Sequence, residues 1–216
     1  AKLTALNIVG DGTFTAGATA ATTTALASLD GSTATGAITV TQNMDFASGA
    51  TIKTGFNSDS VTLDVLTEGN IAVDMGEFTG TADTLLIAGA NNMGLTVVDL
   101  SAADQISQLN GAINGAVQTG IENITLSGLT GSFGATVTGS ADANTIIGTG
   151  NADNIIAGEA ADTITGGDGV DTLTGGTGAD TITGGEGADN FVYNTVDTST
   201  AAAMDIIMDY ASGSDI

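Results

Sequence analysis

Apolar residues recur at every ninth position through the last third of the chain. From Gly139 the sequence divides without gaps into six nonapeptides, which end at Val192. The eighth residue of each unit is apolar, and these residues are Ile146, Ile155, Ile164, Leu173, Ile182 and Phe191. Such a repeat is typical of a solenoid, in which each unit buries its apolar side chain by stacking on its neighbours.

Each nonapeptide combines a turn with a short strand. The first six positions are rich in glycine and acid, which favours a turn containing residues at positive φ. The last three positions place one apolar residue between neighbours that are mostly β-branched or polar, as a half-buried strand requires. We therefore predict a right-handed parallel β-roll with strands at 145–147, 154–156, 163–165, 172–174, 181–183 and 190–192. Nine residues reverse the chain, so each unit should stack on the unit two places further along.

The sixth position carries an acid in five units and an asparagine in the first. Stacking of alternate units would place Asp162 over Asp180, and Asp171 between Asp153 and Asp189. Stacked carboxylates repel each other unless a cation lies between them, and an all-oxygen ligand set suits Ca²⁺ better than transition metals. We predict that several Ca²⁺ ions are bound, with side-chain and carbonyl ligands from Asp153, Asp162, Asp171, Asp180, Asp189, Asn144, Asn151, Gly167, Gly169, Gly176, Gly178, Gly185 and Gly187.

The last three units read GGDGVDTLT, GGTGADTIT and GGEGADNFV, over residues 166–192. They resemble the haemolysin-type (RTX) nonapeptide GGxGxDxUx, and the three units before them are degenerate. The resemblance implies a calcium-binding parallel β-roll. The stretch from Met204 to Ile216 is similar to the segment that caps such rolls in proteins exported by type I secretion. We expect residues 193–216 to be the start of a C-terminal cap in a chain that is part of a larger protein.

Residues 1–138 lack the nonapeptide but contain short β-like runs between Gly, Asn and Asp breaks. These runs are Leu3–Val9, Ala37–Thr41, Ser60–Leu66, Asn70–Met75, Thr84–Ala88, Gly94–Val98, Ile121–Leu126 and Ala135–Thr138. Asp59 and Asp83 each precede an apolar strand residue by two positions, and we predict that they are either further Ca²⁺ ligands or exposed turn residues. The apolar spacing of Ser101–Val117 predicts one short helix.

Composition excludes several kinds of chemistry. The chain has 25 acidic and 2 basic residues, a net charge of −23, and neither His nor Cys. It therefore offers no thiol nucleophile, no Ser-His-Asp triad and no zinc site of the usual ligands. The negative charge argues against binding to nucleic acid or to anionic membranes. No apolar run reaches the roughly 18 residues that a membrane span needs. We expect no enzymatic activity from this chain.

The Thr/Ala-rich pattern of residues 1–138, together with Gly120–Leu126, is similar to bacterial surface-layer proteins of the RTX type. This resemblance implies an extracellular structural protein that forms a calcium-dependent two-dimensional lattice with copies of itself. It also allows contact with cell-surface polysaccharide through regions outside this chain. The alternatives are the C-terminal export and folding module of a secreted protease, lipase or epimerase, and a fragment of an adhesin. In each case the metal's binding free energy should supply much of the folding free energy.

Overall fold

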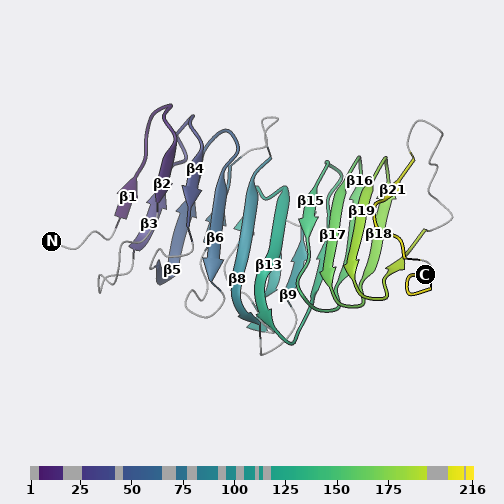
Figure 1. The fold of residues 1–216 in the computed structure, drawn as a ribbon. Coiled ribbons are helices and arrows are strands. Elements are labelled where there is room, and N and C mark those ends of the chain that lie inside the picture. The colour runs from purple at the N-terminus through teal and green to yellow at the C-terminus, as the bar shows by residue number, and fades with distance from the viewer. Residues whose placement is uncertain are drawn as a thin grey trace.

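The computed structural model describes residues 5–16, 26–41, 46–64, 72–76, 82–91, 96–100, 105–109, 112–113, 118–193, 204–211 and 213–216. In these ranges the chain forms strands and turns and no helix. The strands stack into an elongated solenoid with the N-terminus at one end and the C-terminus at the other (Figure 1). The predicted all-β parallel solenoid is therefore confirmed, and none of the described residues forms a helix that could cross a membrane.

One parallel sheet runs along the whole described length of the solenoid. Its nine strands are, in spatial order, β2 (Phe14–Ala16), β4 (Ile38–Val40), β6 (Ser60–Asp64), β8 (Thr84–Asn91), β13 (Asn123–Gly131), β15 (Thr145–Ile147), β17 (Thr163–Asp168), β19 (Thr181–Glu186) and β21 (Ile206–Ile207). This long sheet crosses from the irregular N-terminal part into the repeats without interruption, because β13 pairs with both β8 and β15.

The remaining strands, most of which alternate along the chain with those of the long sheet, form two further sheets. A five-stranded sheet contains β1 (Ala5–Asn7), β3 (Leu26–Asp30), β5 (Phe46–Lys53), β7 (Ala72–Asp74) and β12 (Gln118–Thr119). A seven-stranded sheet contains β11 (Ala112–Ile113), β10 (Ile106–Leu109), β9 (Thr96–Asp99), β14 (Ala135–Thr138), β16 (Asn154–Glu159), β18 (Thr172–Thr177) and β20 (Asn190–Phe191).

The register of the repeats confirms the predicted stacking of alternate units. Thr163 pairs with Thr181, and Thr172 pairs with Asn190, so partners lie eighteen residues apart. The strands β16 to β19 are longer than predicted, since each continues into the first three positions of the next unit. Coils before the repeats are longer, as the pairing of Ser60 with Thr84 shows.

The apolar residues form a narrow core between the sheets. The eighth residue of every nonapeptide is buried, with exposed fractions from 0% at Ile146 to 8% at Phe191. The N-terminal coils continue the same core, and their largest fully buried side chains include Leu29, Ile38, Ile52, Met75, Leu85 and Ile87. One line of apolar side chains per coil therefore joins the two parts of the chain.

The predicted helix at Ser101–Val117 is wrong. Within the described part of this segment, β10 pairs in antiparallel fashion with β9 and with β11. Two glycines, Gly111 and Gly115, each weaken a helix by about 1 kcal/mol, and the edge of β9 offers backbone partners instead. The buried Gln105 side chain fixes the start of the hairpin, because its amide bonds to Leu100 and to both backbone groups of Ile121.

The C-terminal segment adds one more coil to the solenoid. Strand β21 pairs with β19, and Ile216 exchanges backbone hydrogen bonds with Phe191 and Asp189. The Tyr210 ring lies against Phe191, with ring centroids 6.1 Å apart. The segment therefore covers the last nonapeptide, as the expected cap would.

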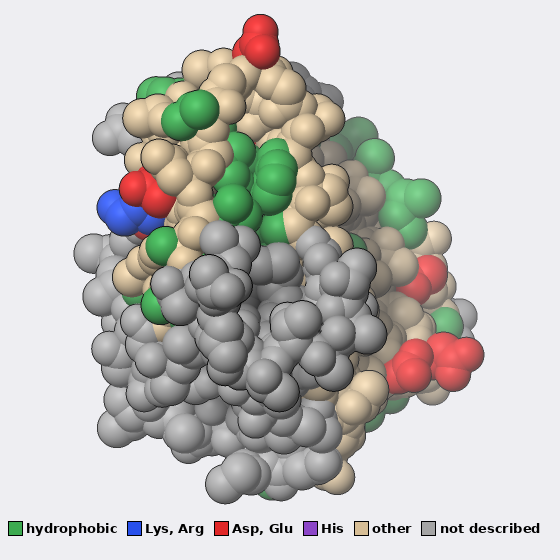
Figure 2. All heavy atoms as spheres, turned by 90° about the vertical axis from the view of Figure 1, so that its left-hand side faces the viewer, with side chains coloured by type: hydrophobic (Ala, Val, Ile, Leu, Met, Phe, Trp, Pro, Cys, Tyr) green, Lys and Arg blue, Asp and Glu red, His purple; other side chains and the backbone are tan. Residues whose placement is uncertain are grey.

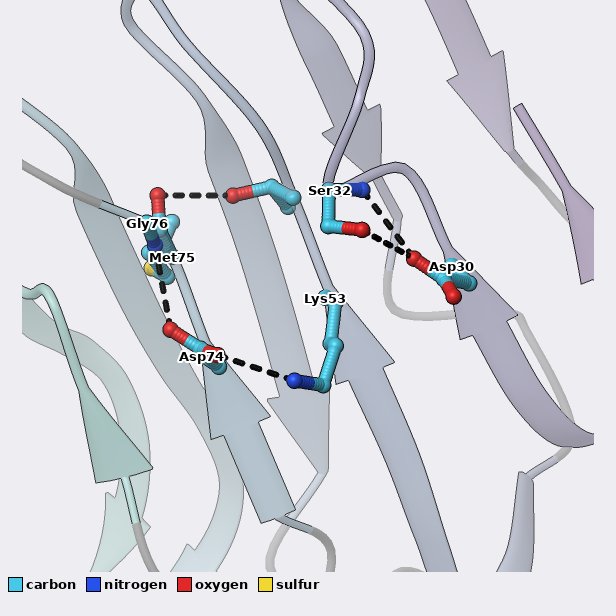
Figure 3. Close-up of polar contacts among 7 residues, drawn as sticks. Asp30, Ser32, Lys53, Asp74, Met75 and Gly76 are labelled. Atoms are coloured by element: carbon cyan, nitrogen blue, oxygen red, sulfur yellow. Dashed lines mark hydrogen bonds and ion pairs between the residues drawn. The ribbon is translucent and has the colours of Figure 1, made fainter. Parts of the chain in front are cut away.

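A basic side chain lies beside an acidic one on the N-terminal side of the molecule (Figure 2). Strand register explains this pairing, since Lys53 lies between Asp30 and Asp74 on neighbouring strands. The Lys53 Nζ is 3.2 Å from Asp74 Oδ2 (Figure 3). Hydrogen bonds from Ser32, and secondarily the charge of Lys53, hold the pKa of Asp30 below its usual value. A lysine thus balances acids on the surface of this part of the chain.

Candidate metal centre

The residues at the sixth position of the nonapeptides, together with acids at equivalent places in the other coils, form two rows that run along the solenoid. The Asp171 row contains Asp153, Asp171, Asp189 and Asp215, and the Asp162 row contains Asp59, Asp83, Glu122, Asn144, Asp162, Asp180 and Asp205. Each row arises because the residue lies directly before a strand whose register repeats from coil to coil. The predicted neighbours of Asp171, which are Asp153 and Asp189, are the ones observed.

Within a row, one carboxylate oxygen of each coil accepts a backbone hydrogen bond from the coil before it. The Asp153 N–H donates to Asp171 Oδ1 at 2.8 Å, and the Asp171 N–H donates to Asp189 Oδ1 at 3.0 Å. The Asp162 N–H donates to Asp180 Oδ1 at 2.8 Å in the other row. These bonds leave the second carboxylate oxygen as the atom that decides how each charge is stabilised.

That second oxygen is buried and unpaired at Asp162 and Asp171. Their side chains are 2% and 0% exposed, and neither Oδ2 has a hydrogen-bond partner. Burial, with a smaller contribution from the charges of neighbouring acids, raises the pKa of each carboxyl to about 7. An unpaired buried carboxylate is strongly destabilising. These two positions therefore need a proton or a cation.

The glycines predicted as carbonyl ligands lie where a turn must pass close to the next coil. Gly167, Gly169, Gly176, Gly178, Gly185 and Gly187 all have positive φ. A Cβ on Gly176 would lie 1.9 Å from the carbonyl oxygen of Gly158, and one on Gly185 would lie 1.8 Å from that of Gly167. Only glycine fits there. Each turn therefore packs closely against a backbone carbonyl oxygen of the coil before it.

The turns also hold the carboxylates against their own backbone. A Cβ on Gly166 would lie 2.3 Å from Asp171 Oδ2, and one on Gly184 would lie 2.3 Å from Asp189 Oδ2. Carboxylate and carbonyl oxygens in a cradle of this kind are the ligands that Ca²⁺ prefers. The residues thus fit calcium, with Asp162 and Asp171 offering unpaired oxygens. Among the described residues no three acidic side chains form a cluster, because each turn contributes one.

The other predicted ligands lie in or beside the same two rows. Asp180 and Asp189 are each 1% exposed. Asp180 follows Asp162 in its row, and Asp189 follows Asp171. Asp153 and Asn144 precede them and are also buried. The Asn151 amide donates instead to the carbonyl of Phe133 in the adjacent coil, at 3.4 Å.

Asp59 and Asp83 belong to the Asp162 row, far outside the repeats. They are 2% and 3% exposed, so the alternative of an exposed turn residue is wrong for both. The Asp59 N–H donates to Asp83 Oδ1 at 2.7 Å, and the Asp83 N–H donates to Glu122 Oε2 at 2.8 Å. Burial raises the pKa of Asp83 to about 7 and also raises that of Glu122. Whether Asp59 and Asp83 bind calcium stays a prediction at this point.

Sequence reasoning missed four acids of this arrangement: Glu122, Asp205, Asp209 and Asp215. Glu122 and Asp205 each stand two residues before an apolar strand residue, the same spacing that marked Asp59 and Asp83, so a signal was present. Asp209 has no such signal. Its carboxylate accepts from the N–H groups of Gly184 and Gly185, at 2.9 and 2.8 Å, and so holds the last glycine turn from the C-terminal coil.

A family model of the RTX calcium-binding nonapeptide repeat (4 copies) matches residues 129–164, 138–173 and 165–194. The matched region contains the turns from Asn144 to Asp189 and does not reach Asp59 or Asp83. No curated protein matches the chain.

Proposed function

We propose that the protein is a calcium-dependent structural protein of a bacterial surface layer. The calcium part of the proposal is supported by the match of residues 129–194 to RTX calcium-binding nonapeptide repeats. RTX repeats are typical of secreted proteins that bind calcium. The surface-layer role goes further, and it combines the calcium-binding turns with the outer surface of the solenoid.

The observation that carries this proposal is the outer face of the long sheet. One outward-facing row crosses successive coils in register and contains Thr39, Ser60, Thr84, Asn123, Thr145, Thr163 and Thr181. Every one of these side chains is small and uncharged, although the chain as a whole carries a net charge of −23. The side chains of this row therefore add no like-charge repulsion of their own to a contact between identical molecules.

The need for calcium in the repeats suits a protein that folds outside the cell. The buried carboxylates of Asp162 and Asp171 need a proton or a cation, and extracellular calcium modules bind with dissociation constants of about 10⁻⁴–10⁻³ M. A chain exported by type I secretion would therefore leave a calcium-poor cytosol with its repeats empty and load them outside the cell. We propose no catalytic activity for this chain, because the acids that the structure describes lie in the two rows, hold the last glycine turn or lie on the surface.

Light scattering and electron microscopy of the purified chain test the proposal. In millimolar calcium we expect ordered two-dimensional assemblies, and we expect excess EGTA to return them to soluble subunits. A matched sample in millimolar magnesium controls for ionic strength, since Mg²⁺ demands octahedral geometry and keeps its waters. A chain that binds calcium but stays monomeric at high concentration would contradict the lattice role and favour an export and folding module of an enzyme or adhesin.

A further inference from the structure

The turns of the two rows fall into two classes that differ in one hydrogen bond. In a closed turn, the backbone N–H four residues before the acid or amide donates to its side-chain oxygen. Thr149 donates to Asp153 Oδ2 at 2.6 Å, and Ala211 donates to Asp215 Oδ2 at 2.7 Å. The same bond joins Ser140 to Asn144 at 2.7 Å and Gly55 to Asp59 at 3.1 Å.

In an open turn, the residue four positions before the acid is a glycine at positive φ. These glycines are Gly158, Gly167, Gly176 and Gly185, with φ between 109° and 122°. They are strand residues, since Gly158 pairs with Gly176 and Gly167 with Gly185 across the coils. The strand continues through the start of the turn, and the glycine N–H does not donate to Oδ2 of Asp162 or Asp171. The Gly185 N–H donates instead to Asp209 Oδ2, at 2.8 Å.

The acids of closed and open turns differ in whether both of their carboxylate oxygens have hydrogen-bond partners. Asp153 is satisfied within its own turn, because Oδ2 accepts from Thr149 N–H while Oδ1 accepts from Ala135 N–H and from the Thr149 hydroxyl. Asp162 and Asp171, in open turns, each have an unpaired buried Oδ2. In a closed turn a backbone N–H therefore stabilises the second carboxylate oxygen. In an open turn a cation must stabilise that oxygen instead.

We propose that calcium binds at the open turns, which precede Asp162, Asp171, Asp180 and Asp189, and not at the closed turns. Asp59, Asn144, Asp153 and Asp215 then hold metal-free turns, and the first three are removed from the predicted ligands. The calcium-binding coils are bounded by closed turns on both sides, at Asn144 and Asp153 before them and at Asp215 after them. This inference rests on calcium binding by the repeats and is independent of the lattice role.

A consequence follows for folding. The coils up to β16 contain the closed turns and a larger share of bulky buried side chains, so they fold without calcium. The coils from β17 to β20 contain the open turns and depend on the metal. The calcium-free protein is therefore a folded N-terminal solenoid whose exposed edge, at β15 and β16, is the template on which the repeats fold when calcium arrives.

Calcium stoichiometry of matched variants, measured by native mass spectrometry, tests the assignment. Asp171→Asn and Asp153→Asn remove one charge each from adjacent coils of the same row and keep an oxygen acceptor in place. We expect Asp171→Asn to bind at least one ion fewer than the wild-type chain and Asp153→Asn to bind the same number. Asp59→Asn should also leave the number unchanged.

A loss of ions from Asp153→Asn or Asp59→Asn, in chains that circular dichroism shows to be folded, would overturn the inference. The Asp59→Asn comparison holds even if the Asp171 variant fails to fold. A wild-type chain that binds no calcium would instead overturn the calcium chemistry on which the proposed function depends, so the two failures are distinguishable.

Discussion

The coils up to β16 and the nonapeptide coils from β17 onward share one long sheet and one row of acids, yet they stabilise those acids differently. In the N-terminal coils Asp59 accepts N–H groups from Ile38 and Gly55, and Asp83 accepts one from Asp59. In the repeats, Asp162 and Asp171 keep an unpaired buried oxygen. The comparison shows that a buried acid in a solenoid marks a position in the coil, and that the turn before it decides whether a metal is needed.

The coils with open turns are also shorter than the N-terminal coils. The open turns between β16 and β19 leave only three residues between strands, because the residues at positions two and four of each unit have positive φ and reverse the chain tightly. The N-terminal coils need longer connections, as the pairing of Thr39 with Ser60 and of Ser60 with Thr84 shows. Those coils gain bulky core residues such as Ile38 and Leu85, and they are stable by burial. The short coils have less apolar surface and depend on calcium.

The largest expected effect comes from truncating the core in each region. Leu85→Ala and Leu173→Ala remove the same atoms from fully buried positions, and each should destabilise its coils by about 2–5 kcal/mol. In EGTA, however, only Leu85→Ala should lower the thermal unfolding midpoint, because the coils around Leu173 are already unfolded. Equal effects of Leu173→Ala with and without calcium would contradict the division.

The next effect is on calcium affinity within the repeats. Asp171→Ala removes a buried carboxylate and the acceptor of the Asp153 N–H, so we expect an affinity at least about tenfold lower, equivalent to about 1.4 kcal/mol. Asp168→Ala, three residues away and exposed, should change it little. Isothermal titration with calcium measures both, and similar affinities would show that Asp171 is no ligand.

The pH dependence of the calcium-free chain comes next. Burial raises the pKa of Asp162 and Asp171 to about 7 in the folded state, above the ordinary value near 3.8. Between these values the folded state binds more protons than the unfolded state, so its stability falls as pH rises. In EGTA the repeats should therefore gain β-structure as the pH is lowered from 8 to 5, as circular dichroism would detect. A gain of structure with rising pH would contradict the raised pKa values.

The smallest effect concerns Ala160, which has a φ of 68° where the later repeats have Gly169, Gly178 and Gly187. A left-handed conformation costs an L-residue roughly 1–2 kcal/mol, and the extra freedom of glycine when unfolded offsets part of that. We expect Ala160→Gly to stabilise the calcium-bound protein by up to about 1 kcal/mol, as a higher midpoint in calorimetry. Ala161→Gly is the matched control, since Ala161 is not among the positive-φ residues, and it should stabilise nothing.

The sequence predicts the repeats well because a nine-residue period fixes strand, core residue and acid together. It predicts the N-terminal strands where β-branched runs are dense, as at Ser60–Asp64, and misses the three-residue β2 as well as β3 and β5, which contain Ala, Ser or Gly at several positions. The helix prediction failed because the apolar spacing of Ile106 and Leu109 suits a helix and a hairpin equally, and β9 offered a sheet edge. The class of each turn depends on whether the second position is glycine at positive φ, which the spacing of acids alone does not reveal.

Hydrogen exchange of the wild-type chain, with calcium and with excess EGTA, tests the central claim most directly. The account predicts that amides of β4, β6, β8 and β13 stay protected in both conditions. Amides of β17, β18, β19 and β20 should lose their protection in EGTA and regain it when calcium is restored. Loss of protection along the whole solenoid in EGTA, or protection of β17 to β20 without calcium, would contradict a fold that calcium completes only in its C-terminal coils.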